Sequence, residues 1–228
     1  MSESSMMSDA VSASTTTGSA SLISPSIPSV PSSSSTPPLK LGVMASGSGS
    51  NLEAIAQAIA DQALNAQIQV LIYNNPDAKA AARADRWGIP KVWLNHRDFA
   101  SREDLDRAIV QVMHQHGVDW IIMAGWMRVV TQVLLDAFPD RILNLHPSLL
   151  PSFPGVRAVE QALAAGVKIT GCTVHLVRLE VDNGPIIIQA AVPILPNDTP
   201  ETLHQRIQTQ EHRIYPAAIA LISTGCRV

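Results

Sequence analysis

Residues 39–51 read Leu39-Lys-Leu-Gly-Val-Met-Ala45 and then Ser46-Gly-Ser-Gly-Ser-Asn51. The first seven residues are mostly apolar and have the length of a buried strand. The Ser/Gly run predicts a tight turn before a helix that begins near Asn51. A strand, a Gly-rich turn and a helix form the opening unit of an α/β sheet.

Short apolar runs alternate with helical patterns along the rest of the chain. We expect further strands at 68–73, 91–94, 120–124, 141–145, 171–177 and 185–194. We expect helices at 77–87, 102–116 and about 200–222, the last capped by Asp198 or Thr199. This alternation predicts an α/β fold with a single doubly wound, mostly parallel sheet, helices on both faces and antiparallel pairing near the C-terminal strands.

The first 38 residues are rich in Ser, Thr, Pro and Ala and contain no Lys or Arg. Such a segment buries too little apolar surface to offset its ordering entropy. We therefore expect residues 1–38 to be a disordered tail and residues 39–228 to be one catalytic domain. The tail lacks the basic start and apolar block of a signal peptide. A transit peptide stays open as an alternative, although it should contain Arg and avoid acids.

The composition argues against several classes of protein. No apolar run is long enough to cross a bilayer, and the net charge of −3 does not suggest a nucleic-acid surface. The two cysteines, Cys172 and Cys226, form no CxxC pair, which indicates a reducing compartment. We therefore expect a soluble, cytoplasmic protein, with no nucleic-acid or membrane partner, that is a monomer or a homodimer.

Three loops, at 46–50, 125–128 and 144–151, follow the carboxyl ends of expected strands, where open parallel sheets bind ligands, so we expect them to share one crevice. The Gly-rich loop lacks the ending of a P-loop and the third Gly of a dinucleotide fingerprint, so no nucleotide cofactor is expected. Its N–H groups, converging at a helix N-terminus, would suit a single phosphate. A tight turn with Asn51 as helix cap is the alternative.

Asn144 and His146 alternate with leucines at the end of a buried strand. Because side chains alternate along a strand, both should point to one side and could meet one substrate atom. Three prolines stiffen the loop that follows, and Leu150-Pro151 is a candidate cis bond. A hydrogen-bonded structural histidine is the alternative interpretation of His146.

Asp182 lies in a turn that reads Glu180-Val-Asp-Asn-Gly-Pro185. Gly184 gives this turn backbone freedom, so that it can present Asp182 inward. A carboxylate beside an imidazole favours the charged ring, and an Asn amide beside a charged His is a pair of donors for a developing oxyanion. The alternative is an ordinary turn residue, because the sequence does not show that Asp182 is close to His146.

The candidate residues include neither a nucleophile nor a metal site. No Gly-x-Ser-x-Gly elbow surrounds a serine, which favours direct attack of one substrate on another through a tetrahedral intermediate. Cys172 and His175 are three apart on a strand and point to opposite faces. His114 and His116 are only two apart on a helix. No metal is therefore expected.

On these motifs the chain resembles the glycinamide ribonucleotide transformylases, also called phosphoribosylglycinamide formyltransferases. The Asn-x-His-Pro-Ser-Leu-Leu-Pro run is highly specific for folate-dependent formyl transfer, whereas the Gly-rich loop alone is a weak signal. The resembling segments follow in order over about residues 39–225: Ala45-Ser-Gly-Ser-Gly-Ser-Asn-Leu52, Ala124-Gly-Trp-Met-Arg128, Asn144-Leu-His-Pro-Ser-Leu-Leu-Pro151, Gly171-Cys-Thr-Val-His175, Asp182-Asn-Gly-Pro185 and Gln208-Thr-Gln-Glu-His212.

The resemblance implies that a formyl group passes from 10-formyltetrahydrofolate, as co-substrate, to the amine of glycinamide ribonucleotide in purine biosynthesis. It implies that Asn144 and His146 stabilise the oxyanion of the intermediate. Asp182 would keep His146 charged and position a water that relays a proton from the amine to the leaving nitrogen. The partners implied are small molecules, and no metal is implied.

The resemblance also implies two sets of binding residues. The ribonucleotide would be held by Gly49, Ser50, Asn51, Gln208 and Glu211. The folate would lie against Arg102, Met127, Arg128, Val129, Val130, Asn144, Arg178, Leu179, Glu180, Val181 and Asp182. Two positions depart from the pattern, since Val159 stands where many relatives have His and Ser152 where some have Lys.

Three other functions stay open at this point. Methionyl-tRNA formyltransferases and formyltetrahydrofolate deformylases share the Asn, His and Asp set. The first should carry a basic RNA-binding domain after the catalytic one, and the second an N-terminal regulatory domain and a different Pro-Ser segment. A non-catalytic binding protein should have lost Asn144, His146 or Asp182, and all three are present.

Overall fold

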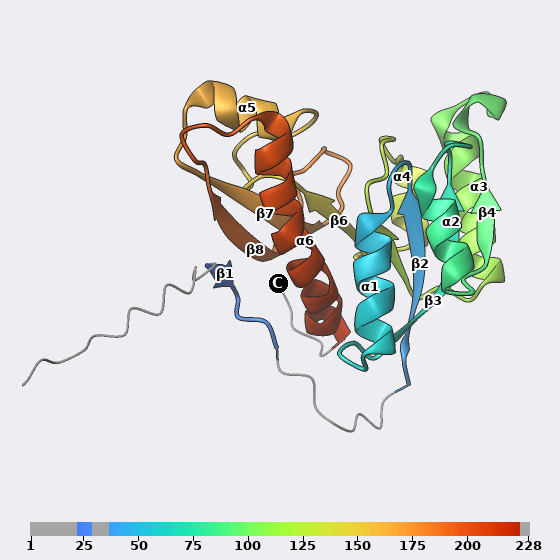
Figure 1. The fold of residues 1–228 in the computed structure, drawn as a ribbon. Helices are drawn as coiled ribbons and strands as arrows, with labels where there is room; N and C mark the ends of the chain where they lie inside the picture. Colours follow the sequence, from blue (N-terminus) through green and yellow to red (C-terminus); the bar gives the residue numbers. More distant parts are fainter. Residues whose placement is uncertain (1–21, 29–36, 224–228) are drawn as a thin grey trace, which may run out of the picture.

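A computed structural model describes residues 22–28 and 37–223, and its strands form one sheet in the order β1-β8-β7-β6-β5-β2-β3-β4 (Figure 1). The strands are β1 Ile23–Ser24, β2 Leu39–Ala45, β3 Ala66–Tyr73, β4 Lys91–Trp93, β5 Trp120–Met123, β6 Ile142–His146, β7 Ile169–Leu176 and β8 Ile186–Pro193. The helices are α1 Ser50–Ala60, α2 Lys79–Arg86, α3 Arg102–Gln115, α4 Gln132–Ala137, α5 Ala158–Ala165 and α6 Pro200–Ser223, with a short 3-10 turn η1 at His96–Asp98.

Strands β2 to β6 pair in parallel, and β6, β7, β8 and β1 pair antiparallel. The predicted mixed sheet is therefore confirmed, with boundaries that differ by one to a few residues. Helices α4 and α5 were not predicted, because each is only a few residues long and too short to show a clear helical period.

Helices cover both faces of the sheet, as the doubly wound arrangement requires. Ile55 of α1 and Ile214 of α6 belong to one apolar cluster with strand residues such as Leu143. Ile109 of α3 and Leu134 of α4 belong to a second cluster on the opposite face. Figure 1 shows α6 running beside α1, so this pair joins the C-terminal half of the sheet to the N-terminal half.

The chain reverses its direction of winding at β2. From β2 it winds outward through β3 to β4, and it then returns to place β5 on the other side of β2. The loops after β2 and β5 meet at this switch point, where the Ser46 N–H donates to the Gly125 carbonyl (3.0 Å) and the Met127 N–H to Ser46 Oγ (2.9 Å). Switch points are where open α/β sheets bind ligands.

Residues 22–24, which lie inside the predicted disordered tail, pair with the edge of the sheet. In β1, Ile23 lies opposite Ala190 of β8, and the Ala191 N–H donates to the Leu22 carbonyl (2.9 Å). The edge of β8 offers backbone groups that the tail can pair with, whatever its composition. The prediction for 1–21 and 29–36 lies outside the described residues.

Two smaller predictions are also settled. Thr199 caps α6, because Thr199 Oγ1 accepts from the Thr202 N–H (3.3 Å), and the Leu150-Pro151 bond is cis. Within the described ranges, no helix is long and apolar enough to span a membrane.

Gly171 in β7 allows a close approach of β8, which makes Gly171→Ala a test of the packing. A Cβ there would lie 1.9 Å from the Ala190 carbonyl oxygen, so backbone must move, and we expect a loss of about 1–3 kcal/mol in the free energy of unfolding. Urea unfolding measures this. Gly47→Ala is the control, because its Cβ would meet nothing within 4 Å. Equal stabilities of the two variants would contradict the assigned register of β7 and β8.

Candidate functional site

The loops predicted to share one crevice do so. They border a cleft of about 670 Å³, a volume ordinary for a small-molecule site. The segments that line it are the Gly-rich loop 47–51, the residues 123–127, 129 and 130 at the end of β5 and after it, the end of β6 at 144–147, residues 155–160, residue 175 of β7, the turn at 177–179, 181 and 182, and the α6 residues 200, 201, 204, 208 and 211. The cleft therefore draws on both halves of the sheet.

Asp182 joins the two polar residues at the end of β6. Its Oδ2 lies 3.2 Å from His146 Nδ1, and its Oδ1 accepts from Asn144 Nδ2 at 3.4 Å. The side chains of Asp182 and His146 are each 6% exposed, so water hardly screens their contact. The proximity that the sequence could not show is present.

The turn that carries Asp182 has a backbone reason for its sequence. Asp182 itself has a positive φ of 55°, a conformation that Asp adopts more readily than most residues. Gly184 is needed for a different reason from the predicted one: a Cβ there would lie 1.7 Å from the Leu176 carbonyl oxygen. The close approach of this turn to the end of β7 sets the position of Asp182.

Several contacts keep Asp182 ionised. Burial alone would raise the pKa of this carboxyl group, but His175, the Gly155 N–H at 2.8 Å and the His146 ring lower it below its ordinary value. Such donors stabilise the charged form. Asp182 is therefore a carboxylate near neutral pH and can act as an acceptor and a counterion.

Both ring nitrogens of His146 face acceptors. Nδ1 faces Asp182, and Nε2 lies 2.8 Å from the carbonyl oxygen of Phe153, which can only accept. The ring is therefore held on both sides, between a carboxylate and a backbone carbonyl.

His175 belongs to the site, although the sequence pointed to it only as a rejected metal ligand. It lies opposite Asn144 in the pairing of β6 and β7, and its Nε2 is 3.3 Å from Asn144 Nδ2 and 3.6 Å from Asp182 Oδ1. Its Nδ1 donates to the Leu176 carbonyl (2.9 Å), which holds Nε2 beside both Asn144 and Asp182. Only the antiparallel register could have revealed this contact.

The Gly-rich loop ends at Gly49, which is the residue before α1 and has a φ of 71°. A Cβ at Gly49 would lie 2.7 Å from the Ala80 Cα, so the loop packs against α2 as closely as glycine allows. Asn51 does not cap the helix, contrary to the alternative considered from the sequence. Its Nδ2 instead donates to Glu211 Oε2 of α6 (3.0 Å), across the base of the cleft.

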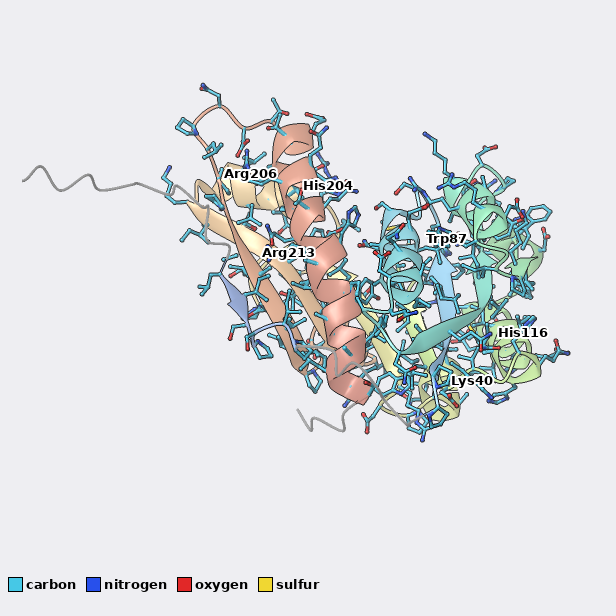
Figure 2. All side chains as sticks on the ribbon, turned by 60° about the horizontal axis from the view of Figure 1, so that its bottom comes forward. Lys40, Trp87, His116, His204, Arg206 and Arg213 are labelled. Carbon is cyan, nitrogen blue, oxygen red and sulfur yellow. The ribbon has the colours of Figure 1, made fainter. Side chains whose placement is uncertain are left out.

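Glu211 is a buried acid, and it forms no ion pair within the ranges that the structure describes. Burial raises its pKa above the ordinary value, against the hydrogen bond from Asn51 and the charge of His204, which lower it. His204, labelled in Figure 2, comes from the first turns of α6 and also lines the cleft, as does Gln208. All five residues predicted to hold a ribonucleotide line this cleft, and two of them, Asn51 and Glu211, are hydrogen-bonded to each other.

Several exposed apolar side chains form a rim on the same cleft. Met127 is 70% exposed, and Val129, Leu179 and Val181 are also exposed and line the cleft. Exposed apolar side chains grouped beside a cleft indicate a ligand surface. Of the residues predicted to contact folate, Arg102, Arg128 and Glu180 do not line the cleft, so their roles stay predictions.

Cys172 carries no sign of nucleophilic chemistry. It is fully buried, and burial together with nearby Glu211 raises the pKa of its thiol. Cys226 lies outside the described residues. Across the part of the chain that the structure describes, no three His, Cys, Asp or Glu side chains gather as a set of metal ligands.

Comparisons with known proteins agree with the geometry. A family model described as formyl transferase matches residues 39–219. Phosphoribosylglycinamide formyltransferase of Bacillus subtilis is 42% identical over 180 residues, which cover 79% of this chain and 92% of that protein. The crystal structure of glycinamide ribonucleotide transformylase 1 from Symbiobacterium toebii superposes with a TM-score of 0.81 at 47% identity, covering 82% of this chain and 89% of that one.

A longer relative is also similar. The trifunctional purine biosynthetic protein adenosine-3 of Drosophila melanogaster is 44% identical over 188 residues, which cover 82% of this chain. The match spans only 14% of that protein. The comparison therefore concerns one part of a multifunctional chain.

The buried Glu211 predicts a pH-dependent effect of Glu211→Gln. Because its folded pKa lies above 4.5, the folded chain keeps a proton that the unfolded chain has released, so wild-type stability falls as pH rises from about 4.5 through the folded pKa. Glutamine does not titrate, so the variant lacks this loss. Relative to wild type, its free energy of unfolding should rise over that pH range, by about 1.4 kcal/mol for each unit by which folding raises the pKa of Glu211.

Urea unfolding at a series of pH values measures the difference. Glu201→Gln is the control, because Glu201 is exposed on the same helix and its pKa is lowered. The stability of this variant relative to wild type should therefore fall, and not rise, as the pH increases. If the free energies of unfolding of Glu211→Gln and wild type differ by the same amount at pH 4 and pH 8, the raised pKa of Glu211 is refuted.

Proposed function

The chain belongs to the formyl transferase family, and we propose that it transfers the formyl group of 10-formyltetrahydrofolate to the amine of glycinamide ribonucleotide. The observation that carries this proposal is the contact of Asp182 with both His146 and Asn144, inside the cleft described above. The similar enzymes named phosphoribosylglycinamide formyltransferase support the choice of substrates.

The proposed reaction needs no protein nucleophile. The substrate amine attacks the formyl carbon, and the carbonyl π electrons move to oxygen to give a tetrahedral oxyanion. The Asn144 amide and the positive ring of His146, which lies between Asp182 and the Phe153 carbonyl, stabilise that charge. The oxyanion then re-forms the C=O bond, and the bond from carbon to the folate nitrogen breaks.

One proton must move from the attacking amine to the leaving folate nitrogen. Asp182 is ionised and has both oxygens directed at donors in the cleft. We assign it two tasks: it keeps His146 charged, and it positions a water that passes the proton between the two nitrogens. The proton balance then closes within the substrates and that water.

The two ends of the cleft suit the two substrates. At one end, the N–H groups at the start of α1 would hold the ribonucleotide phosphate, while Asn51, Gln208 and Glu211 would contact the rest of this substrate. At the other end, the apolar rim around Met127 and Leu179 would cover the flat ring of the folate. The amine and the formyl group would then meet between them, beside Asn144.

The remaining expectations are part of the same proposal. We place the protein in the cytoplasm, with small molecules as its partners and a monomer or homodimer as its assembly. The formyl donor is a co-substrate, and the reaction as written uses no metal.

His146→Ala is expected to lower kcat by about 10²- to 10³-fold or more, the effect of removing one oxyanion donor. Release of tetrahydrofolate from purified protein with both substrates measures it, and calorimetry should show little change in ribonucleotide binding. His116→Ala, at the C-terminal end of α3 and outside the cleft, is the matched control. The proposal fails if wild type formylates only methionyl-tRNA, only hydrolyses the donor, or turns over none of these substrates.

A crystal structure with glycinamide ribonucleotide is expected to show its phosphate within hydrogen-bonding distance of the N–H groups of residues 49–51. Gly49→Ala should weaken binding of the ribonucleotide by 10-fold or more (about 1.4 kcal/mol), because a Cβ displaces the loop from α2. Calorimetry checks the variant, with Gly47→Ala as control. A phosphate bound elsewhere would overturn the substrate assignment.

A further inference from the structure

A row of polar side chains runs across the sheet from the catalytic histidine. His146 of β6 lies opposite Thr173 of β7, and Thr173 lies opposite Gln189 of β8. Residues directly opposite each other in an antiparallel pair point to the same face. The row therefore lies on one face, in a sheet whose interior is otherwise mainly apolar.

Thr173 is the centre of a buried hydrogen-bond network. Its Oγ1 donates to the Ser148 carbonyl (2.7 Å) and accepts from the Leu150 N–H (3.1 Å) and from Gln189 Nε2 (2.9 Å). Gln189 Nε2 also donates to the Leu150 carbonyl (2.9 Å). One hydroxyl and one amide thus hold the loop after β6 at Ser148 and at Leu150.

The same loop returns to His146. Ser148 Oγ donates to the Ser152 carbonyl (2.5 Å) and lies 3.4 Å from the Phe153 carbonyl. The Phe153 carbonyl is the group that accepts from His146 Nε2 at 2.8 Å. A chain of contacts therefore connects β8 to Nε2 of His146. It runs through Gln189, Thr173, Ser148 and Phe153.

We propose that Thr173 and Gln189 are positioning residues that set the orientation of the His146 ring through the loop 148–153. They touch neither substrate and act only by fixing where the Phe153 carbonyl lies. With Asp182 on the other nitrogen, that carbonyl fixes the plane of the ring. This inference rests on the proposed function, in which His146 stabilises the oxyanion.

The network is sensitive to one substitution because it is saturated. Thr173 is 0% exposed, and its hydroxyl makes one donated and two accepted hydrogen bonds, which is its full capacity. Valine keeps the shape of threonine but leaves the Leu150 N–H and the Ser148 carbonyl without this partner. Buried backbone groups rarely stay unpaired, so the loop must shift to satisfy them.

The test compares Thr173→Val, which keeps the volume, with Thr173→Ser, which keeps the hydroxyl. Thr173→Val should lower kcat by about 10- to 100-fold, since small misplacements of a catalytic group have effects of this size. KM for the ribonucleotide should stay within about threefold, because its proposed binding residues are untouched, and Thr173→Ser should keep most of the wild-type kcat. A packing role would give the reverse order of the two variants.

Thr170→Val is the matched control. Thr170 lies in the same strand and is equally buried, and its Oγ1 has no hydrogen-bond partner among the described residues. It should therefore leave kcat unchanged. Gln189→Met, at a half-buried position, removes the second donor and should lower kcat in the same direction. If Thr173→Val does not fold, the kcat of Gln189→Met is measured in its place.

Nitrogen-15 NMR of the histidine rings gives a readout that does not depend on turnover. The His146 Nε2 signal should move in Thr173→Val and stay in place in Thr170→Val. If wild type shows no activity but these signals behave as expected, the proposed function fails and the network stands. If Thr173→Val keeps wild-type kcat, or Thr173→Ser falls as far as Thr173→Val, the positioning role is wrong.

Discussion

The Asp182 carboxylate, buried beside His146 and Asn144, is the contact on which the arrangement of the site depends. A buried carboxylate is unfavourable unless donors surround it. Here the Gly155 N–H, the His146 ring and the Asn144 amide provide them, and the result is an ionised group in a nearly dry position. Two loops and one strand end must be in place at once to satisfy it, so the carboxylate fixes the relative positions of all three.

The fold makes this convergence possible by changing the pairing of the sheet at β6. On one side β6 pairs in parallel with β5, which places its carboxyl end at the ligand-binding edge. On the other side it pairs antiparallel with β7, which brings His175 and Thr173 opposite Asn144 and His146. The pairing with β5 therefore places the end of β6 at the cleft, and the pairing with β7 places polar side chains beside it.

The second contact between the halves of the molecule is made by α1 and α6. Asn51 and Glu211 meet across the base of the cleft, 160 positions apart in the chain. Glu211 is buried with a raised pKa, so it contributes little favourable electrostatics of its own to the folded state. Its position among the residues proposed to hold the ribonucleotide gives a reason why such a group is present there.

The sequence by itself determined the α/β sheet and the order of its main elements, and it singled out Asn144, His146 and Asp182 as the candidate reaction centre. Alternating apolar runs and turn residues are local signals, and the motif around Asn144 and His146 is local as well. Only the tertiary structure decided that Asp182 contacts His146, that His175 and Thr173 lie behind the site, and that Ile23–Ser24 pairs with β8. These facts depend on strand register and on an available sheet edge, which arise from pairings between distant segments that no local pattern encodes.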